Sequence, residues 1–381
     1  MKVMTILGTR PEIIRLSRVI PLLDGLCQHV LVHTGQNYDP TLSDVFFSEL
    51  GVRQPDHFMG VRGSMAGQIA GILTHAEELF TQHKPDRLLI LGDTNSGLSA
   101  MIAARMRIPV FHMEAGNRCY DDRVPEEINR RVIDHTSDVL MPYTYRSKEN
   151  LVREGIARER IFVTGNPIFE VLEHYAPQVG ASDVLDRLGV QAGEFFLVTL
   201  HRAENVDQPA RLDSFLTALA RVADEYAKPM VVSVHPRTAD AMARHGLTPG
   251  SDRVRLMPPL GFFDFVKLEK SAFCVLSDSG TVQEECCIYG VANVTLRDVT
   301  ERPETVECGS NILSGADPDR ILTAVRIATT MSKGWNPPPE YLEPRVAPTV
   351  ARIVLGYDHL LSLPSAPSPS PSAPSGVEGP C

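Results

Sequence analysis

The feature that most constrains the fold is a regular alternation of short aliphatic runs with longer amphipathic stretches. Such runs are apolar on both faces, which suits strands buried inside a parallel sheet. The first series of runs occupies residues 3–7, 30–33, 87–91, 110–113, 139–141 and 161–164. The second series occupies residues 195–200, 230–234, 254–257, 272–276 and 293–296. Two successive series of alternating strands and helices predict an α/β fold of two doubly wound, Rossmann-like domains with a cleft between them.

The break between the two series lies at Gly165-Asn166-Pro167. A chain of 381 residues exceeds what one compact core usually serves, which also favours two domains. We expect an N-terminal domain at 1–168 with catalytic carboxylates, and a C-terminal domain at 169–355 that binds the nucleotide. Residues 356–363 should end the last helix. Residues 364–381 contain six prolines and five serines, which predicts a disordered tail.

Composition narrows the class of protein. The chain has 37 Lys and Arg against 47 Asp and Glu, a net charge of −10, and its basic residues form no block. This argues against nucleic acid or a membrane surface as the main partner. The seven cysteines include no C-x-x-C pair and no metal-binding spacing, which indicates reduced thiols. The N-terminus shows no leader, and no apolar run reaches the length of a membrane span, so we expect a cytoplasmic, soluble protein.

An anion-binding turn follows the run at 272–276. Ser279, Gly280 and Thr281 are small residues at the expected start of a helix, where backbone N–H groups and the helix dipole favour a phosphate. Glu285, one helical turn further on, is placed to accept hydrogen bonds from a ribose diol. A phosphate site beside an acidic side chain predicts a nucleotide ligand.

Carboxylates follow two neighbouring runs of the first series, so we expect them to meet at one edge of the sheet. Asp93 and Glu114 are the first two, and Glu126 and Glu127 begin a helix soon afterwards. Acidic residues in a first turn complement the helix dipole, and we expect this of one of these two glutamates. Asp93, Glu114 and Glu126 would instead surround a reacting carbon. Close carboxylates raise one another's pKa, so we expect the site to hold an acid and a base near neutral pH.

Histidine and arginine side chains follow strands of the second series. His201-Arg202 and His235 stand where runs end, and Arg302 lies in a later loop, where it either binds substrate or forms salt bridges. Arg10 follows the first strand, where it either pairs with a phosphate or is a surface residue of a plain turn. Together these side chains favour a diphosphate site or acid/base chemistry. No histidine spacing typical of a metal site occurs, and we expect no metal.

The ordered set of motifs over residues 1–355 resembles the non-hydrolysing UDP-N-acetylglucosamine 2-epimerase family. The matching motifs are Gly8-Thr-Arg-Pro-Glu12, Gly92-Asp-Thr-Asn95, Glu114-Ala-Gly116, Pro125-Glu-Glu127, His201-Arg-Ala-Glu-Asn205, Asp278-Ser-Gly280 with Gln283-Glu-Glu285, and Thr300-Glu-Arg-Pro-Glu304. The resemblance implies a glycosyltransferase-B-like fold and a homodimer. It also implies interconversion of UDP-GlcNAc and UDP-ManNAc without NAD, a metal or another cofactor.

The resemblance also implies roles for the site residues. UDP would leave by anti elimination to give 2-acetamidoglucal and would add back after C2 is protonated on the other face, which needs a trapped diphosphate and acid/base groups on both faces. Proton transfer falls to Asp93, Glu114 and Glu126, and His201 assists at the departing UDP. Glu285 would bind the ribose. The expected substrate-binding set is Arg10, Arg202, His235, Ser279, Gly280, Glu285 and Arg302.

Three stretches depart from the family pattern. The loop from Gly116 to Pro125 is shorter, Thr281 replaces a second glycine, and Gln36-Asn37-Tyr38-Asp39 replaces the Gln-His stretch of the family's allosteric site. These differences resemble the branch of the UDP-N-acetylfucosamine pathway. A 2-epimerase acting on a UDP-6-deoxy-N-acetylhexosamine and a hydrolysing 2-epimerase are therefore alternatives. A glycosyltransferase of the same fold, which needs one base at most, and a nucleotide-sugar binder without turnover are others.

Overall fold

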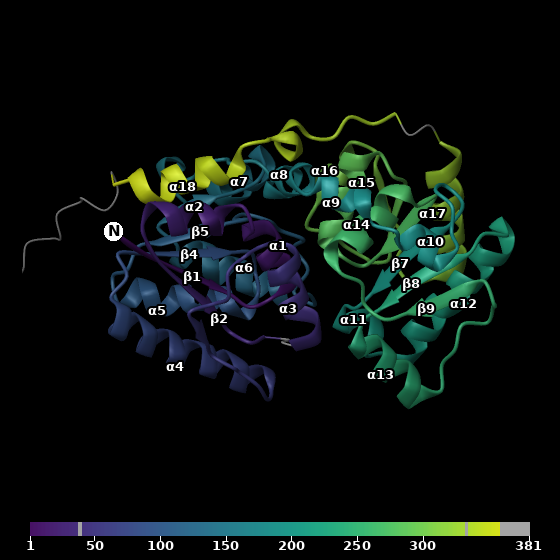
Figure 1. The fold of residues 1–381 in the computed structure, drawn as a ribbon, viewed down its shortest axis with the longest axis horizontal. Coiled ribbons are helices and arrows are strands. Elements are labelled where there is room, and N and C mark those ends of the chain that lie inside the picture. Colours follow the sequence, from purple (N-terminus) through teal and green to yellow (C-terminus); the bar gives the residue numbers. More distant parts are fainter. Residues whose placement is uncertain (37–39, 332–333, 359–381) are drawn as a thin grey trace, which may run out of the picture.

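The computed structural model describes residues 1–36, 40–331 and 334–358, without the side chains of residues 40–44. The predicted tail at 364–381 lies outside the described residues, as do 359–363 and Asn37, Tyr38 and Asp39. Figure 1 shows two α/β units side by side, the first built from the N-terminal part of the chain and the second from the later part.

Each unit contains a parallel sheet of the same doubly wound order. The first sheet has the order β3-β2-β1-β4-β5-β6, and the second has β12-β11-β10-β7-β8-β9, so β7 corresponds to β1 and β10 to β4. The first sheet contains β1 (Lys2–Leu7), β2 (Gln28–His33), β3 (His57–Phe58), β4 (Arg87–Leu91), β5 (Val110–Met113) and β6 (Val139–Met141). The second contains β7 (Phe196–Leu200), β8 (Met230–Val234), β9 (Val254–Met257), β10 (Cys274–Ser277), β11 (Asn293–Thr295) and β12 (Asn311–Leu313).

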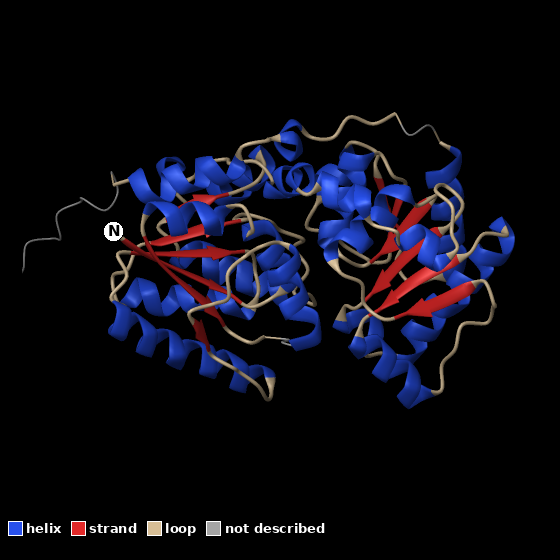
Figure 2. Ribbon diagram, in the orientation of Figure 1, coloured by secondary structure: helices blue, strands red, loops and turns tan. Residues whose placement is uncertain are grey.

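Helices connect the strands and flank the sheets (Figure 2). Those before β7 are α1 (Arg10–Leu16), α2 (Val19–Leu26), α3 (Pro40–Glu49), α4 (Met65–His83), α5 (Ser99–Arg105), α6 (Pro125–Thr136), α7 (Tyr145–Arg153), α8 (Pro167–His174), α9 (Ala176–Ala181) and α10 (Val184–Leu188). Those after β7 are α11 (Ala203–Val206), α12 (Pro209–Tyr226), α13 (Pro236–His245), α14 (Phe262–Ser271), α15 (Gly280–Tyr289), α16 (Pro303–Glu307), α17 (Pro318–Thr330) and α18 (Val346–Gly356). Short 3-10 helices lie at Asn95–Leu98, Arg158–Arg160 and Pro339–Leu342.

The predicted strands are confirmed to within two residues at each end, with one exception. The predicted strand at 161–164 is wrong, because only an isolated bridge joins Leu140 to Ile161 there. Thr164 donates to the carbonyl of Pro142, but Pro142 has no N–H with which to continue a ladder. β3 and β12 were not predicted: they are short and only partly buried, so they lack the run of aliphatic residues that marks the central strands.

The last helix returns to the first unit. Val346, Val350 and Val354 of α18 are buried in the same apolar cluster as Val3 and Leu7 of β1, and α18 contacts α2 and α8. We predicted from the sequence that this segment belongs to the C-terminal domain, but its packing groups it with the first sheet. The boundary at residue 168 stays a prediction.

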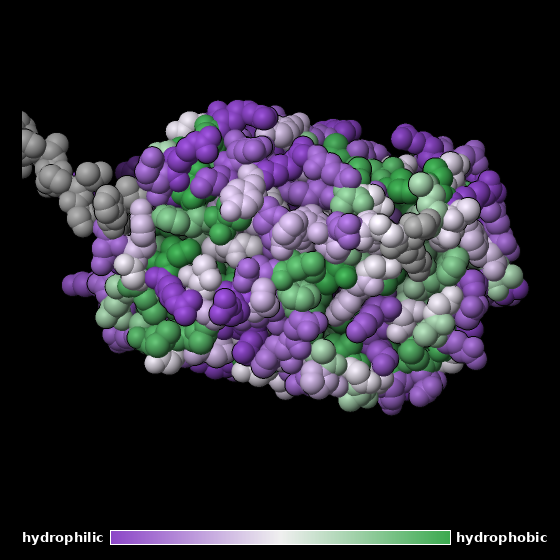
Figure 3. Space-filling view, turned by 90° about the horizontal axis from the view of Figure 1, so that it is seen from above, coloured by the Kyte–Doolittle hydropathy of each residue, from purple (hydrophilic) through white to green (hydrophobic). Residues whose placement is uncertain are grey.

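Polar and apolar residues alternate over the molecular surface that Figure 3 presents. None of the helices in the described part of the chain combines the length and apolar character that a membrane span requires.

Candidate active site

The polar motifs lie at the switch points of the two sheets, where loops after the two central strands diverge and leave a crevice. In the first sheet these strands are β1 and β4, which lead into residues 8–10 and 92–95. In the second they are β7 and β10, which lead into His201 and Ser279. Figure 2 shows the strands of both sheets running towards the region where the two units meet. Motifs far apart in the chain therefore share one interdomain region.

A cavity of about 160 Å³ lies between the two units. Of the predicted substrate-binding residues, Arg10, His235, Ser279 and Glu285 line it, and the predicted catalytic His201 does so too. The predicted binding residues Arg202, Gly280 and Arg302 are absent from its lining and lie in an adjoining charged cluster.

The first turn of α15 forms one wall of this cavity. Its initial N–H groups have no partner within the helix, as at every helix start, and Ser279 is the N-cap residue. The hydroxyl of Thr281, which stands where we noted the missing second glycine, lies 2.9 Å from the hydroxyl of Ser279. Gly280 has no room for a side chain, since an added Cβ would lie 2.7 Å from Oε1 of Glu301. The helix start therefore contacts the charged cluster directly.

His201 is held by a buried aspartate. Its Nδ1 lies 2.9 Å from Oδ1 of Asp278, which also accepts hydrogen bonds from the backbone N–H groups of His201 and Arg202 and from the Asn205 amide. Burial opposes ionisation of Asp278, but His201 and these donors hold its pKa well below the usual range. We did not predict a role for Asp278. Its place directly before Ser279 in the motif was the available signal.

Two groups that line the cavity have shifted pKa values. Burial, reinforced by His201 and Arg10, lowers the pKa of His235 to about 4, so its imidazole is neutral near pH 7. Burial raises the pKa of Glu285 to about 7. Behind it, burial and the Glu285 carboxyl hold the pKa of Glu269 well above its usual value. The carboxyl at the expected ribose position thus keeps its proton to a higher pH than an exposed glutamate does.

A single carboxylate, Glu301, is surrounded by four arginines behind this cavity. Its oxygens lie 2.9 Å from Arg297, 2.9 Å from Arg302, 3.6 Å from Arg202 and 3.9 Å from Arg130. Burial opposes its ionisation, but the arginines hold its pKa well below the usual range. We did not predict Glu301, although it precedes Arg302 in a motif. It joins arginines from both units of the fold.

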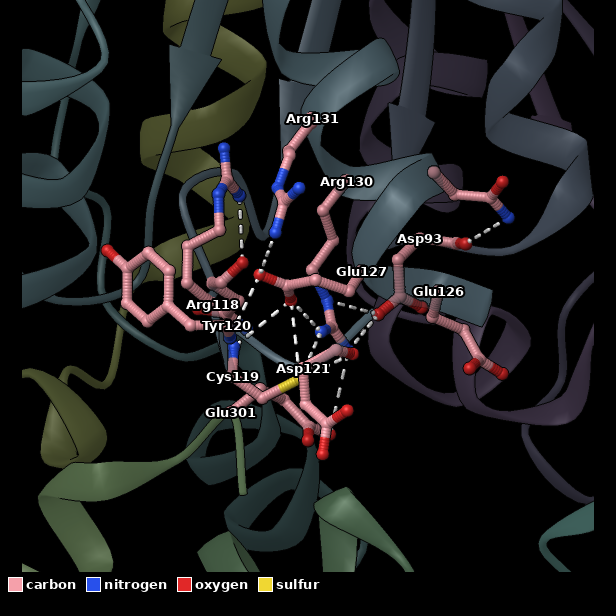
Figure 4. Close-up of polar contacts among 12 residues, drawn as sticks. Asp93, Arg118, Cys119, Tyr120, Asp121, Glu126, Glu127, Arg130, Arg131 and Glu301 are labelled. Carbon is pink, nitrogen blue, oxygen red and sulfur yellow. Dashed lines mark hydrogen bonds and ion pairs between the residues drawn. The ribbon is translucent and has the colours of Figure 1, made fainter. Parts of the chain in front are cut away.

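Asp93 is oriented by Arg130 of α6. Nε and Nη2 of Arg130 lie 2.8 Å and 2.7 Å from the same oxygen of Asp93, and Nη1 lies 2.7 Å from Glu127 (Figure 4). The Asp93 side chain keeps 22% of its surface exposed, whereas that of Arg130 keeps 3%. Arg130 therefore fixes the carboxylate from behind and leaves part of it accessible.

The two glutamates at the start of α6 have different surroundings. Glu127 is fully buried and accepts hydrogen bonds of 3.0 Å from the backbone N–H groups of Cys119 and Tyr120. Glu126 has 35% of its side chain exposed and lies 3.5 Å from Arg202 of the other unit. Glu127 thus holds the loop at Cys119 and Tyr120 in place, which is a structural role. Glu126 faces the interdomain region.

Glu114 is the most enclosed of the three predicted catalytic carboxylates. It has a backbone φ of 65°, pairs with Arg15 and, at 2.6 Å, with Arg302, and accepts a hydrogen bond from the hydroxyl of Tyr143 at 3.2 Å. Burial would raise its pKa, but Arg15 and Arg302 lower it to about 2. Our expectation that neighbouring carboxylates raise one another's pKa is wrong for Glu114, because its ion pairs with Arg15 and Arg302 outweigh any such repulsion.

Across the described residues, no group of three or more histidine, cysteine, aspartate and glutamate side chains has the arrangement of a metal site.

Comparison with known proteins identifies the family. The sequence model of the family described as UDP-N-acetylglucosamine 2-epimerase matches residues 24–355. The chain belongs to this family. A UDP-N-acetylglucosamine 2-epimerase of Methanocaldococcus jannaschii is 39% identical over 354 residues, which is 89% of this chain and 95% of that protein. A Pseudomonas aeruginosa relative named UDP-2,3-diacetamido-2,3-dideoxy-D-glucuronate 2-epimerase is 39% identical over 332 residues, or 86% of this chain and 92% of that one.

A solved structure supports the same family. It is described as the UDP-GlcNAc 2-epimerase of Methanocaldococcus jannaschii in complex with UDP-GlcNAc and UDP, and it superposes with a TM-score of 0.88 at 37% identity, covering 93% of this chain and 99% of that one. The predicted family and the predicted two-part, glycosyltransferase-B-like α/β fold are confirmed. The 2-epimerase described here is accordingly an isomerase.

Proposed function

We propose that this 2-epimerase interconverts UDP-N-acetylglucosamine and UDP-N-acetylmannosamine by inverting C2. The observation that carries the proposal is the contact, at Gly280, between the helix start that lines the cavity and the cluster around Glu301. Glu301 pairs with Arg130, which also pairs with Asp93, and with Arg202, which also pairs with Glu126. These ion pairs connect the cavity to both carboxylates. The UDP-GlcNAc and UDP in the M. jannaschii structure support the same ligand for this member of the family.

The chemistry explains why such a site needs two parts. The C2 proton of an N-acetylhexosamine is not acidic enough for direct removal. Anti elimination breaks the C1–O bond, releases UDP and leaves 2-acetamidoglucal, and UDP adds back after C2 is protonated on its opposite face. One part of the site must therefore keep UDP in place while the other moves protons.

The second unit supplies most of the proposed UDP site. The start of α15 at Ser279 and Gly280 suits a phosphate, and Glu285, which lines the cavity, suits the ribose. His235 accepts a hydrogen bond from the Arg237 N–H at Nδ1, 3.2 Å away, so its neutral ring keeps Nε2–H as a donor. The remaining cations of the proposed site are Arg10, Arg202 and Arg302, and His201 is the proposed donor to the departing diphosphate.

The three carboxylates are suited to different tasks. Asp93 and Glu126 keep 22% and 35% of their side chains exposed, so we assign the two faces of C2 to them. Glu114 keeps 5% and is ionised down to about pH 2, which makes it a weak base. We therefore assign Glu114 an electrostatic role in place of proton transfer. Its negative charge holds Arg15 and Arg302 beside the sugar site.

The test follows hydrogen exchange at C2. UDP-GlcNAc incubated with the enzyme in D2O should gain deuterium at C2 and yield UDP-ManNAc, as observed by NMR. Asp93→Asn should lower kcat by about 10² to 10⁴-fold, the range for a lost acid/base group, with UDP affinity retained. Protein that binds UDP yet gives neither deuterium exchange nor UDP-ManNAc would contradict the proposal.

A second candidate substrate is a UDP-2,3-diacetamido-2,3-dideoxy-glucuronate, the sugar for which the Pseudomonas aeruginosa relative is named. This relative has the same 39% identity to the chain as the M. jannaschii epimerase, so its sugar should be tested in the same assay. Its sugar carries a second acetamido group and a carboxylate. Faster turnover of that nucleotide sugar than of UDP-GlcNAc would favour this candidate. The comparisons do not favour the 6-deoxy or the hydrolysing alternative.

We also propose a homodimer and a cytoplasmic location for this epimerase, as the family resemblance implies. Light scattering coupled to size-exclusion chromatography should give twice the 41.9 kDa mass of one chain. A monomer at the concentrations used for activity assays would contradict the dimer.

A further inference from the structure

Two cysteine thiols that the proposed reaction does not use touch one another behind the active site. The sulfur atoms of Cys287 and Cys308 are 3.6 Å apart. Cys287 is fully buried on α15, and Cys308 follows the last residue of α16 and is half-buried. The two thiols therefore lie between two helices that both approach the charged cluster, and Cys308 is the more exposed residue of the pair.

This pair is close to the geometry of a disulfide. A disulfide has an S–S length of about 2.05 Å, so the sulfurs must approach by about 1.5 Å from their present separation. Gly309 directly follows Cys308 with a φ of 84°, which places a flexible residue next to the more exposed thiol. The hydrogen bond with Cys287 lowers the pKa of Cys308 in spite of its burial. Cys308 is also the more exposed residue of the pair, and the thiolate is the nucleophilic form of cysteine, so Cys308 is the thiol that reacts first.

We propose that Cys287 and Cys308 form a reversible disulfide when the enzyme meets a hydroperoxide, and that this disulfide slows turnover. In the first step the Cys308 thiolate attacks one peroxide oxygen, and an S–O bond forms as the O–O bond breaks. The other oxygen leaves as hydroxide, which takes up the proton released by the Cys308 thiol and becomes water, and Cys308 becomes a sulfenic acid. The Cys287 sulfur then attacks the Cys308 sulfur, the S–O bond breaks, and hydroxide leaves as water with the Cys287 proton. The two sulfurs lose two electrons, and hydrogen peroxide is reduced to two waters.

The helices joined by the disulfide carry groups of the active site. Glu284, one turn before Cys287 on α15, lies 3.0 Å from Arg302, the N-cap residue of α16. On the same short helix, Glu304 accepts a hydrogen bond of 2.7 Å from Thr144 of the first unit. Drawing the end of α16 towards α15 would thus displace Arg302 and its pairing with the first unit.

The experiment uses the full chain with Cys381→Ser in every variant, because Cys381 lies outside the described residues and its thiol would allow crosslinks between molecules. Each carbamidomethyl group replaces a thiol hydrogen, so hydrogen peroxide should lower the intact mass of the alkylated protein by two carbamidomethyl groups per chain. Peptide mapping should join Cys287 to Cys308. Turnover should fall at least five-fold, and dithiothreitol should restore it.

Matched variants separate this pair from general oxidation. Cys308→Ser should retain its turnover before and after peroxide, whereas Cys27→Ser, which removes a half-buried thiol of the first unit, should respond as the parent does. Absence of the Cys287–Cys308 peptide, or equal sensitivity of Cys308→Ser, would overturn the proposal. A disulfide that forms without a change in turnover would overturn its regulatory part.

A readout independent of substrate is available from the single tryptophan of the chain. Nε1 of Trp335 donates a hydrogen bond of 3.0 Å to the carbonyl of Cys287. Since disulfides quench nearby indole fluorescence, emission should fall on oxidation of the parent and stay constant in Cys308→Ser. The mass and fluorescence results hold whichever UDP-sugar is the substrate, so a failure of the proposed function is distinguishable from a failure of the disulfide.

Discussion

At the scale of single residues, the charge of a buried carboxyl group follows its immediate partners. Glu114 pairs with Arg15 and Arg302 and has a pKa of about 2, whereas burial raises the pKa of Glu12 to about 7. The Glu12 carboxyl accepts hydrogen bonds from neutral groups, among them the Gly8 N–H, 3.0 Å away, and the hydroxyls of Thr9 and Thr94. These bonds offset part of the burial cost, and in the described part of the chain Glu12 is a member of none of the ion pairs that could offset the rest.

The raised pKa of Glu12 makes stability depend on pH. The pKa of Glu12 is 4.5 in the unfolded chain and about 7 in the folded protein, so the folded state binds the proton more tightly. The stabilisation from this proton is therefore fully present below pH 4.5 and is lost as the pH rises to 7. We expect the wild type to lose free energy of unfolding relative to Glu12→Gln across this window. The loss should be at most roughly 1.4 kcal/mol per unit of pKa difference.

Urea denaturation across this pH range measures the effect, with Glu77→Gln on the exposed side of α4 as the control. A difference between wild type and Glu12→Gln that is constant with pH would contradict the raised pKa.

Arg130 supports a second prediction at this scale. Lysine keeps the charge but cannot reach Asp93 and Glu127 at once, because it lacks the planar guanidinium group. Arg130→Lys should lower kcat on the order of 100-fold by misplacing Asp93, with little change in UDP affinity. Steady-state kinetics and calorimetry measure the two quantities. Arg131→Lys, at a neighbouring position with 41% of its side chain exposed, should leave both unchanged, and equal losses in the two variants would argue for a general effect on α6.

At the scale of elements, the start of α15 shows why a glycine is needed where a helix packs closely against charged side chains. An added Cβ at Gly280 would lie 2.7 Å from Glu301 and 3.2 Å from Arg302. Glu301 cannot move aside easily, because arginines from several elements hold it. The close approach of the helix start to these side chains therefore depends on a missing side chain.

Gly280→Ala should therefore shift either the phosphate-binding turn or the cluster. We expect kcat/KM to fall by about 10 to 100-fold, the effect of a displacement near 1 Å in an active site. The control is Gly25→Ala on α2, where an added Cβ meets no atom within 4 Å. Unchanged kinetics in Gly280→Ala would contradict this prediction, because Glu301 and Arg302 would then have moved aside without any effect on catalysis.

At the scale of the whole molecule, contacts across the two units fix their relation. The N–H of Phe262 donates to Glu49 at 2.7 Å, and the hydroxyl of Thr144 donates to Glu304 at 2.7 Å. The cavity is lined from both sides of this boundary. A ligand in it adds contacts that exist only when both units are folded, so nucleotide binding should stabilise the entire chain.

UDP at 100 times its dissociation constant should add about 2.7 kcal/mol to the free energy of unfolding. The corresponding rise in Tm, measured by calorimetry, should persist in Asp93→Asn and should be much smaller in Glu285→Ala at the same UDP concentration. This pattern would separate nucleotide binding by the second unit from proton transfer by the first. A full shift in Glu285→Ala would remove Glu285 from the proposed UDP site.

The amino-acid sequence by itself determined ten of the twelve strand positions that the structure describes, the doubly wound architecture and the family, because aliphatic periodicity and ordered motifs are properties of the chain. It also marked Asp93, Glu114, Glu126 and His201. It did not predict Arg130 or Glu301 as partners in the site.

Only the tertiary structure decided which charges meet. Arg15 and Arg302 enclose Glu114 from opposite parts of the chain, so its pKa falls where the linear spacing of carboxylates predicted a rise. The tertiary structure also showed that α18 packs against the first unit. The physical reason is that periodicity is local, whereas Coulomb interactions and burial depend on distances between residues that can be hundreds of positions apart in the chain.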